Sequence, residues 1–262
     1  MSGLSVTLRK RLPGFDLDVG WAVREGFTVL FGYSGAGKSL TLSMIAGTMR
    51  PDDGRVVLDG TTLCDTRTGA WVPAQRRRIG YVPQSAQLFP HMTVSGNVEY
   101  ALKGVPREER RRRAIDLLER FQVDDLADKR PHQLSGGQRQ RCALARALAP
   151  APHALLLDEP LAALDLPLRV EMRQLLVEAQ RDSNVPFVMV THDLIEACTL
   201  ADTLVVYSGT GAVQVGAPGE LVGDPATPEI RRLLHAMELP ESLFGHRDAG
   251  PVVSLNRKGN VA

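Results

Sequence analysis

The clearest chemical signal in the sequence is a glycine-rich loop that ends in a lysine and a hydroxyl residue. The loop matches G-x-x-x-x-G-K-[ST] and lies between the apolar run Phe27–Phe31 and a predicted helix. Glycines let a backbone wrap a polyphosphate with its N–H groups pointing inward, and a helix N-terminus favours anions. Lys38 would place its charge on the β- and γ-phosphates, and Ser39 would bind Mg²⁺. The predicted phosphate loop consists of Gly32, Tyr33, Ser34, Gly35, Ala36, Gly37, Lys38 and Ser39.

Two carboxylates follow a second apolar run and predict a hydrolytic function. Ala154–Leu157 has the pattern of a buried strand, and Asp158 and Glu159 come directly after it. Sheets in which strands alternate with helices bind ligands beyond the carboxyl ends of their strands. We expect Asp158 to hold Mg²⁺, directly or through water, and Glu159 to polarise the attacking water.

A third segment also has the features of an anion site. Ser135 can cap the helix that follows it, and two glycines allow backbone N–H groups to approach an anion closely. The segment comprises Ser135, Gly136, Gly137 and Gln138, and 97 residues separate Lys38 from Ser135. The phosphate loop and this segment are two anion-binding devices, and one nucleotide does not need both of them from a single chain. We therefore predict that each device faces the nucleotide held by another copy, in a homodimer or a pair of ATPase subunits.

In their order along the chain, these motifs resemble those of ABC-transporter ATPase subunits, over about residues 4–235. Leu134–Gln138 (LSGGQ) is similar to the family signature, Gln84 to the Q-loop, Ala163–Asp165 to the D-loop and His192 to the switch histidine. The resemblance implies ATP and Mg²⁺ as cofactors, with Lys38, Glu159 and His192 in catalysis. It implies a metal site at Ser39, Gln84 and Asp158. It also implies that Leu40 and Gln84 contact the nucleotide. Ser135–Gln138 and Asp165 would contact the nucleotide of the other subunit, across a head-to-tail dimer.

The residues alone leave simpler alternatives for three of these positions. Gln84 has the character of an ordinary polar loop residue, and Asp165 could cap the helix predicted at Leu168–Asp182. His192 ends a buried strand, and Asp193 with Glu196 matches a helix capping box, so a structural histidine fits as well.

Two positions depart from the family pattern. Tyr33 replaces a usual proline, and Leu40 replaces a usual hydroxyl residue, which deletes a possible hydrogen bond to the α-phosphate. Phe15 is our choice for the aromatic side chain that stacks on adenine, and a place in the core is the alternative.

The resemblance is strongest to importer-type ATPases. Leu88–Val98 is similar to the segment that touches a coupling helix of the membrane subunit. The resemblance therefore implies two transmembrane permease subunits bound through Gln84–Val98, an extracytoplasmic solute-binding protein acting indirectly, and a peripheral place on the cytoplasmic face of the inner membrane. Lys10–Trp21, Leu30–Ser39 and Val190–Asp202 look most like molybdate/tungstate importer ATPases. Importers of sulfate, polyamines, iron or sugars remain alternatives.

The composition excludes several other classes of protein. The chain has 31 Lys and Arg against 30 Asp and Glu, a net charge of +1, which argues against wholesale binding of nucleic acid. Its three cysteines are far apart, which argues against a disulfide framework and a CxxC metal site. No apolar run approaches the ~20 residues that span a bilayer. A soluble ABC ATPase acting on nucleic acid remains a distant alternative, because the chain has one such domain and no heptad repeats.

The elements that must position these residues alternate between strand and helix. This alternation predicts an α/β fold: a P-loop NTPase core with a mostly parallel sheet and flanking helices, plus antiparallel N-terminal strands at Leu4–Leu8 and Phe15–Val19. We predict an ABC ATPase domain over residues 1–239, with its core at about 1–85 and 152–239 and an inserted α-helical subdomain at about 86–151. Residues 240–262 are expected to be a short, loosely ordered tail rather than a regulatory β domain.

Three further segments have simple interpretations. Leu40–Met49 is predicted to be a helix that Pro51 closes. Arg76–Arg78 is interpreted either as a flank of the nucleotide or membrane subunit or as a surface turn. Arg107–Arg113 is interpreted as the solvated face of an amphipathic helix.

Overall fold

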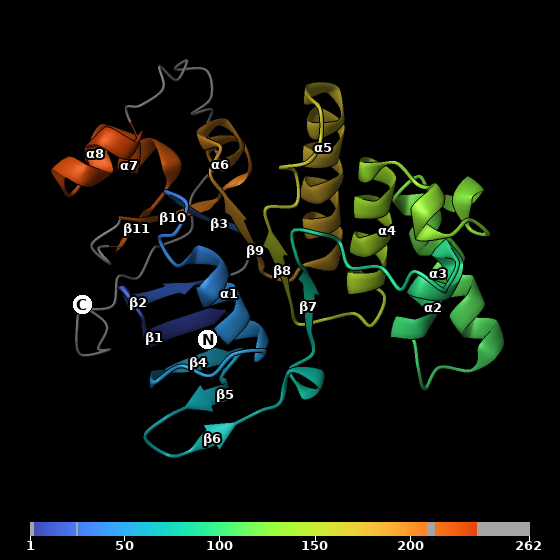
Figure 1. The fold of residues 1–262 in the computed structure, drawn as a ribbon, viewed down its shortest axis with the longest axis horizontal. Helices are drawn as coiled ribbons and strands as arrows, with labels where there is room; N and C mark the ends of the chain where they lie inside the picture. Colours follow the sequence, from blue (N-terminus) through green and yellow to red (C-terminus); the bar gives the residue numbers. More distant parts are fainter. Residues whose placement is uncertain (1–2, 25, 209–212, 235–262) are drawn as a thin grey trace.

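A computed structural model of the chain describes residues 3–24, 26–208 and 213–234. Two sheets lie together at one end of the long axis, and a group of helices lies at the other end (Figure 1). The predicted tail at 240–262 lies outside the described residues. Among the described residues, no helix combines the length and the apolar character needed to cross a membrane.

The larger sheet has the strand order β11-β10-β3-β9-β8-β7. All neighbouring strands in it are parallel except the pair β10 and β11. The three central strands β3, β9 and β8 are buried along their whole length, which explains why their sequences are continuous apolar runs. The strands are β3 (Phe27–Gly32), β7 (Ile79–Val82), β8 (Ala154–Asp158), β9 (Phe187–Thr191), β10 (Thr203–Tyr207) and β11 (Val213–Gly216).

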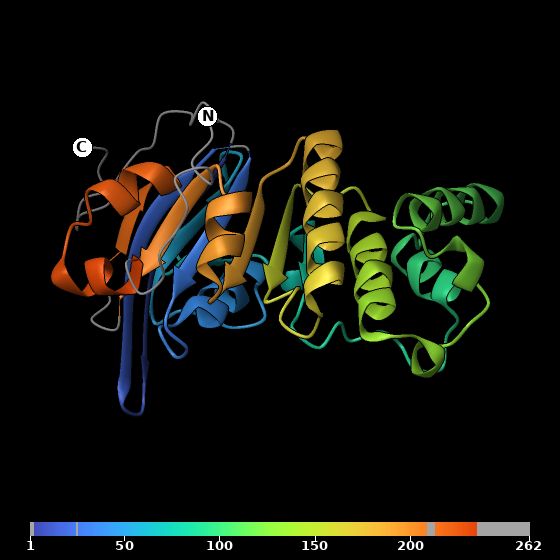
Figure 2. The ribbon, with the colours of Figure 1, turned by 90° about the horizontal axis from the view of Figure 1, so that it is seen from above.

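The smaller sheet is antiparallel and has the order β2-β1-β4-β5-β6. Its first two strands form a hairpin that turns at Pro13–Gly14, pairs Leu12 with Phe15 and projects beyond the rest of the molecule (Figure 2). These strands were predicted, but they are longer than their apolar alternation indicated. The sheet comprises β1 (Leu4–Leu12), β2 (Phe15–Val23), β4 (Asp53–Leu58), β5 (Thr61–Asp65) and β6 (Ala70–Trp71).

The central strands separate two hydrophobic cores, because alternate side chains point to opposite faces of the sheet. Leu30 and Leu156 pack with helix α1 (Lys38–Ala46) and the antiparallel sheet. Val29 and Leu157 pack on the other face, which is covered by α5 (Leu166–Ser183), α6 (Leu194–Leu200), α7 (Pro218–Gly223) and α8 (Pro228–Leu234). The predicted α/β fold with a mostly parallel sheet and flanking helices is confirmed.

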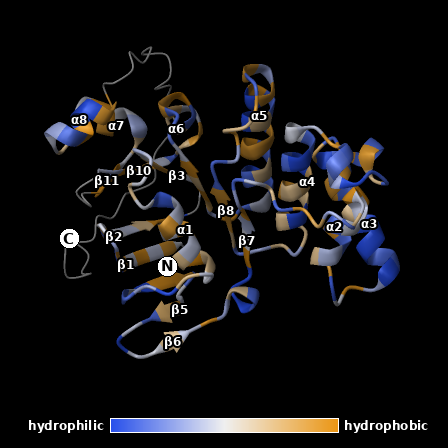
Figure 3. Ribbon diagram, viewed as in Figure 1, coloured by the Kyte–Doolittle hydropathy of each residue, from blue (hydrophilic) through white to orange (hydrophobic). Residues whose placement is uncertain are grey.

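Residues 83–153, all of them described, contain helices and no strand. The outer side of α3 is strongly hydrophilic (Figure 3), and most of Arg107–Arg113 is exposed, as expected of a solvated helix face. The boundaries of the helical subdomain at 86–151 stay a prediction. The helices are α2 (Val94–Ala101), α3 (Arg107–Arg120), η2 (Asp124–Leu126), η3 (Pro131–Gln133) and α4 (Gly136–Leu148).

The end of helix α1 corrects two predictions. Gly47, in the left-handed conformation at φ 83°, closes the helix before Pro51, and its N–H donates to the Ser43 and Met44 carbonyls. Arg77 is 2% exposed, so a surface turn is wrong for this residue. Its guanidinium donates to the carbonyls of Met44 and Ile45 at 2.9 and 2.7 Å. Arg77 directly follows the short 3₁₀ helix η1 (Ala74–Arg76), which places its side chain against the last turn of α1. Arg76 and Arg78 are exposed, and a place for them beside the nucleotide or the membrane subunit stays a prediction.

Candidate functional site

The glycine-rich loop connects the end of β3 to the start of α1. Gly35 and Gly37 have φ values of 83° and 90°, a backbone region that residues other than glycine rarely adopt. A Cβ atom on Gly37 would lie 2.5 Å from Leu17 Cδ1 and 3.0 Å from Phe15 Cζ. A larger residue at position 37 would therefore be strained by its backbone conformation and would displace the Leu17 and Phe15 side chains of β2.

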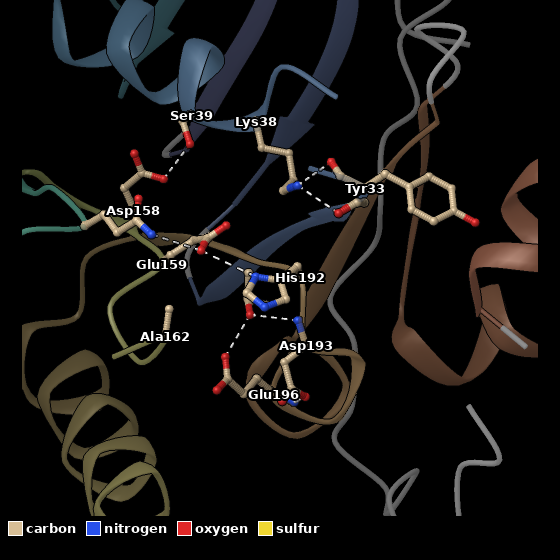
Figure 4. Close-up of polar contacts among 12 residues, drawn as sticks. Tyr33, Lys38, Ser39, Asp158, Glu159, Ala162, His192, Asp193 and Glu196 are labelled. Atoms are coloured by element: carbon tan, nitrogen blue, oxygen red, sulfur yellow. Dashed lines mark hydrogen bonds and ion pairs between the residues drawn. The ribbon is translucent and has the colours of Figure 1, made fainter. Parts of the chain in front are cut away.

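The side chain of Lys38 is folded back onto the loop (Figure 4). Its Nζ donates to the carbonyl oxygens of Gly32 and Tyr33, both at 2.8 Å. These are its two hydrogen bonds within the described residues, so one of the three ammonium donors is left for an anion. Burial lowers the pKa of Lys38, and the carboxylates of Glu159 and Asp158 oppose that shift.

Ser39 and Asp158 form a pair of oxygen ligands at the start of α1 and the end of β8. Ser39 Oγ donates to Asp158 Oδ1 at 2.7 Å, and Tyr81 Oη donates to Asp158 Oδ2 at 3.5 Å. Burial raises the pKa of Asp158, and the hydrogen bond from Ser39 opposes that rise. Among the described residues, no cluster of three or more His, Cys, Asp or Glu side chains forms a complete metal cage. Hydroxyl and carboxylate oxygens fit Mg²⁺, which usually shares its coordination with water and phosphate.

Glu159 lies where three segments meet. Its Oε2 atom is 3.4 Å from His192 Nδ1 and accepts a hydrogen bond of 3.4 Å from Gln84 Nε2. Its backbone N–H donates to Val190 O at 3.0 Å, and its φ of 46° lies in the left-handed region. The parallel pairing of β8 with β9 thus brings together Glu159 and His192, and Gln84 joins them from the segment after β7.

Two helix caps flank this centre. Asp165 accepts a hydrogen bond from the Leu168 N–H at 3.1 Å, so it does cap α5. Asp193 caps α6 by accepting from the Glu196 N–H at 3.0 Å, but the predicted capping box is only half formed. Glu196 Oε2 instead accepts from Thr191 Oγ1 at 2.7 Å, because that hydroxyl, at the end of β9, is a competing donor.

The segment Ser135–Gln138 begins α4 with a complete capping box. Ser135 Oγ accepts from the Gln138 N–H at 3.2 Å, and Gln138 Oε1 accepts from the Ser135 N–H at 2.9 Å. Within the described residues, no hydrogen bond or ion pair joins residues 135–138 to the phosphate loop, Asp158 or Glu159. The two predicted anion devices are therefore not brought together within one chain.

Phe15 and Tyr33 occupy different surroundings beside the phosphate loop. Phe15 is half-buried and packs against the core around α1, whereas Tyr33 is 55% exposed and its ring points away from Lys38 (Figure 4). Leu40, on the first turn of α1, also packs against that core. Stacking of Phe15 on adenine stays a prediction.

The sequence matches a known family over more than half of its length. The sequence model of the family described as "ABC transporter" matches residues 18–162.

The chain is a member of the ABC transporter family.

Similar proteins and a similar structure agree with this assignment. The chain is 44% identical over 236 residues to the molybdate/tungstate import ATP-binding protein WtpC of Archaeoglobus fulgidus, covering 90% of this chain and 95% of that protein. It is 38% identical over 247 residues to the molybdenum import ATP-binding protein ModC of Paramagnetospirillum magneticum, covering 94% of this chain and 68% of that protein. It is 39% identical over 247 residues to the spermidine/putrescine import ATP-binding protein PotA of Haemophilus influenzae, covering 93% and 65%. The structure of cbiO1 from Clostridium perfringens, part of the ABC transporter complex cbiONQ, has a TM-score of 0.74 and 29% identity and covers 90% of this chain and 98% of that one.

The family assignment confirms the predicted ATP binding and ATPase activity. The chain is an ATP-binding ATPase subunit of a membrane transporter, as the resemblance implied. The order of the motifs was sufficient to predict this. Tyr81 and Thr191, which contact Asp158 and Glu196, were not predicted to have these roles, because only the packing reveals their partners. Both lie beside residues that were predicted, Tyr81 three positions before Gln84 and Thr191 directly before His192.

Proposed function

We propose that the chain is the ATPase of an importer for molybdate, tungstate or a closely related oxyanion, acting as a head-to-tail dimer on the cytoplasmic face of the inner membrane. The observation that supports ATP hydrolysis is that five side chains meet at the carboxyl ends of β3, β8 and β9: Lys38, Ser39, Asp158, Glu159 and His192. The solute is proposed because the chain is 44% identical to a molybdate/tungstate import protein along nearly its whole length.

The chemistry of ATP hydrolysis is divided among these residues. Lys38 offers its remaining N–H donor to the β- and γ-phosphates, together with the backbone N–H groups of the loop. Ser39 and Asp158 hold Mg²⁺, with Gln84 as a further ligand candidate, and the bound ion supplies positive charge for the phosphate oxygens. Glu159 accepts the proton of the attacking water, and His192 orients Glu159 and donates to the γ-phosphate.

A composite site follows from the separation of the two anion devices. Ser135 and Gly137 lie on the helical part of the chain and do not contact the phosphate loop of the same chain. In the proposed dimer, they close over the γ-phosphate bound to Lys38 of the other copy, and Asp165 lies near the same boundary. Each of the two ATP sites then contains residues from both chains.

A groove beside the Q-loop supports docking of a permease subunit. It has a volume of about 660 Å³ and lies between β7 and the helices α2 and α4, with Tyr81, Gln87, Phe89, Tyr100 and Arg146 among its lining residues. The rings of Phe89 and Tyr100 are 4.6 Å apart, and the Arg146 guanidinium lies 5.2 Å from the Phe89 ring. Gln87 and Phe89 of this lining lie within the predicted contact segment Gln84–Val98, and Tyr100 lies two residues after that segment on α2.

Transport assays in a deletion strain test the solute. The strain would carry the wild-type gene or the Lys38→Ala variant, and uptake of labelled molybdate, tungstate, sulfate and putrescine would be measured. We expect only the wild type to restore molybdate and tungstate uptake. Restoration of sulfate or putrescine uptake instead would assign a different solute to the same ATPase.

A further inference from the structure

The positions of Glu159 and His192 depend on two separate loops. Glu159 begins the loop between β8 and α5, and His192 lies in the short loop between β9 and α6. Their side chains approach to 3.4 Å, a distance that changes if either loop moves. The backbone bond from Glu159 N to Val190 O fixes the start of the first loop only.

Arg169, in the first turn of α5, touches both loops. Its Nε donates to the carbonyl of Leu164 at 2.9 Å, and its Nη2 donates to the carbonyl of Ala162 at 3.4 Å. Its Nη1 lies 3.5 Å from Asp193 Oδ2 and 3.9 Å from Glu196 Oε1. One planar guanidinium therefore joins two carbonyls after Glu159 to two carboxylates after His192.

The second loop is tied to these carboxylates on both sides of His192 (Figure 4). Thr191 Oγ1 donates to Glu196 Oε2 at 2.7 Å and accepts from the Asp193 N–H at 3.1 Å. The side chain of Glu196 is only 6% exposed, so water does not easily replace these partners. A shift of Glu196 or Asp193 is thus transmitted to the backbone that carries His192.

We propose that Arg169 is a positioning residue that sets the distance between Glu159 and His192 by bridging their loops. The inference rests on the roles of those two residues in the proposed function. Arginine can bridge the two loops because its planar guanidinium has N–H donors in several fixed directions, whereas the ammonium of lysine is a compact point charge. Because the bridge also holds Ala162 and Leu164 beside Asp165, closure of the proposed dimer onto that segment would be transmitted to His192.

Kinetics of the full-length protein test the bridge. Arg169→Met is expected to lower kcat for ATP by about 10- to 100-fold, since small misplacements of catalytic groups cost that much. The KM for ATP should stay within about threefold of the parent, because Arg169 does not touch the phosphate loop. Arg169→Lys should retain part of the rate. Glu196→Gln, which keeps the shape of the side chain and removes its charge, should also lower kcat.

Arg173 provides a matched control on the same helix. It lies one turn further along α5 and adds positive charge near Glu196, without a hydrogen bond to either loop in the described part of the chain. Arg173→Met should therefore keep the parental kcat. Thermal unfolding of every variant separates a change in rate from a loss of folded protein.

A double-mutant cycle with His192→Ala distinguishes positioning from a general structural role. Single-turnover rates with enzyme in excess should show that Arg169→Met or Glu196→Gln adds no further loss once His192 is absent. Multiplicative losses, or a parental kcat in both variants, would overturn the role of Arg169 and leave the proposed function intact. A parental rate for His192→Ala alone would instead overturn the assigned site, and the bridge with it.

Discussion

Replacement of Glu159 by glutamine separates the chemical step from the binding of ATP. Glu159 Oε2 is 3.4 Å from both His192 Nδ1 and Gln84 Nε2, and the side chain is 19% exposed. The amide keeps one oxygen acceptor for these neighbours and loses the ability to take a proton. A general base contributes about 10²- to 10⁴-fold to a rate, which corresponds to about 3–5 kcal/mol of activation free energy.

The structural cost of the same replacement is much smaller. Both side-chain contacts of Glu159 are long, and a typical net hydrogen bond is worth about 0.5–1.5 kcal/mol. The backbone bond to Val190 is unaffected by the side chain. We therefore expect kcat to fall by about 10²- to 10⁴-fold, while the KM for ATP changes by less than about threefold and Tm by less than about 4 °C.

Steady-state ATPase assays, equilibrium binding of ATP and thermal unfolding measure the three quantities. Glu119→Gln, at an exposed position on α3, is the control for loss of a carboxylate. A kcat within threefold of the parent would refute the general-base role. A raised KM with an unchanged kcat would show instead that Glu159 acts in binding.

Three further predictions concern the phosphate loop, the dimer and the core. Lys38→Ala should weaken ATP binding by at least about tenfold, measured by calorimetry, because an uncompensated phosphate charge remains; parental affinity would contradict the assigned role. Ser135→Arg in the Glu159→Gln background should abolish the ATP-dependent dimer seen by size-exclusion chromatography, and a tight dimer would exclude Ser135 from the interface. Burial raises the pKa of Tyr207 to about 12 from its ordinary 10.0. The folded state keeps a proton that the unfolded chain releases above pH 10, so the free energy of unfolding should fall as pH rises from about 10 to 12. Tyr207→Phe should reduce that fall by about 2–3 kcal/mol in urea titrations, and identical slopes would contradict this account.

The parts of the fold that could be predicted are those whose residues decide their own structure. The buried runs of β3, β8 and β9 and the glycine-rich loop depend on local composition, and they appear where the sequence placed them. The short strands β5 and β6 were not predicted, because Thr61–Asp65 has little apolar alternation and the two residues of β6 pair only with β5.

The geometry of the site depends on pairings that a sequence does not reveal. Glu159 and His192 meet because β8 and β9 are parallel neighbours, and the order of strands in a sheet is a tertiary property. Spacing predicted that Glu196 would cap its own helix, yet the nearer hydroxyl of Thr191 takes its carboxylate. Likewise, nothing in the run Arg76–Arg78 distinguishes the one buried arginine from its two neighbours.

The hydrogen bonds from Arg77 to the last turn of α1 have an electrostatic consequence for the opposite end of that helix. The aligned peptide dipoles of α1 are positive at the phosphate loop and negative at the Met44 and Ile45 carbonyls, where the guanidinium lies. Its charge therefore offsets the negative pole and leaves the positive pole facing the predicted phosphate loop. A helix of nine residues is about 14 Å long, and at an effective dielectric constant of about 20 a unit charge contributes on the order of 1 kcal/mol at that distance. The attraction grows with each negative charge on the ligand, so this buried arginine would favour a triphosphate over a monophosphate bound at the predicted phosphate loop, without touching either.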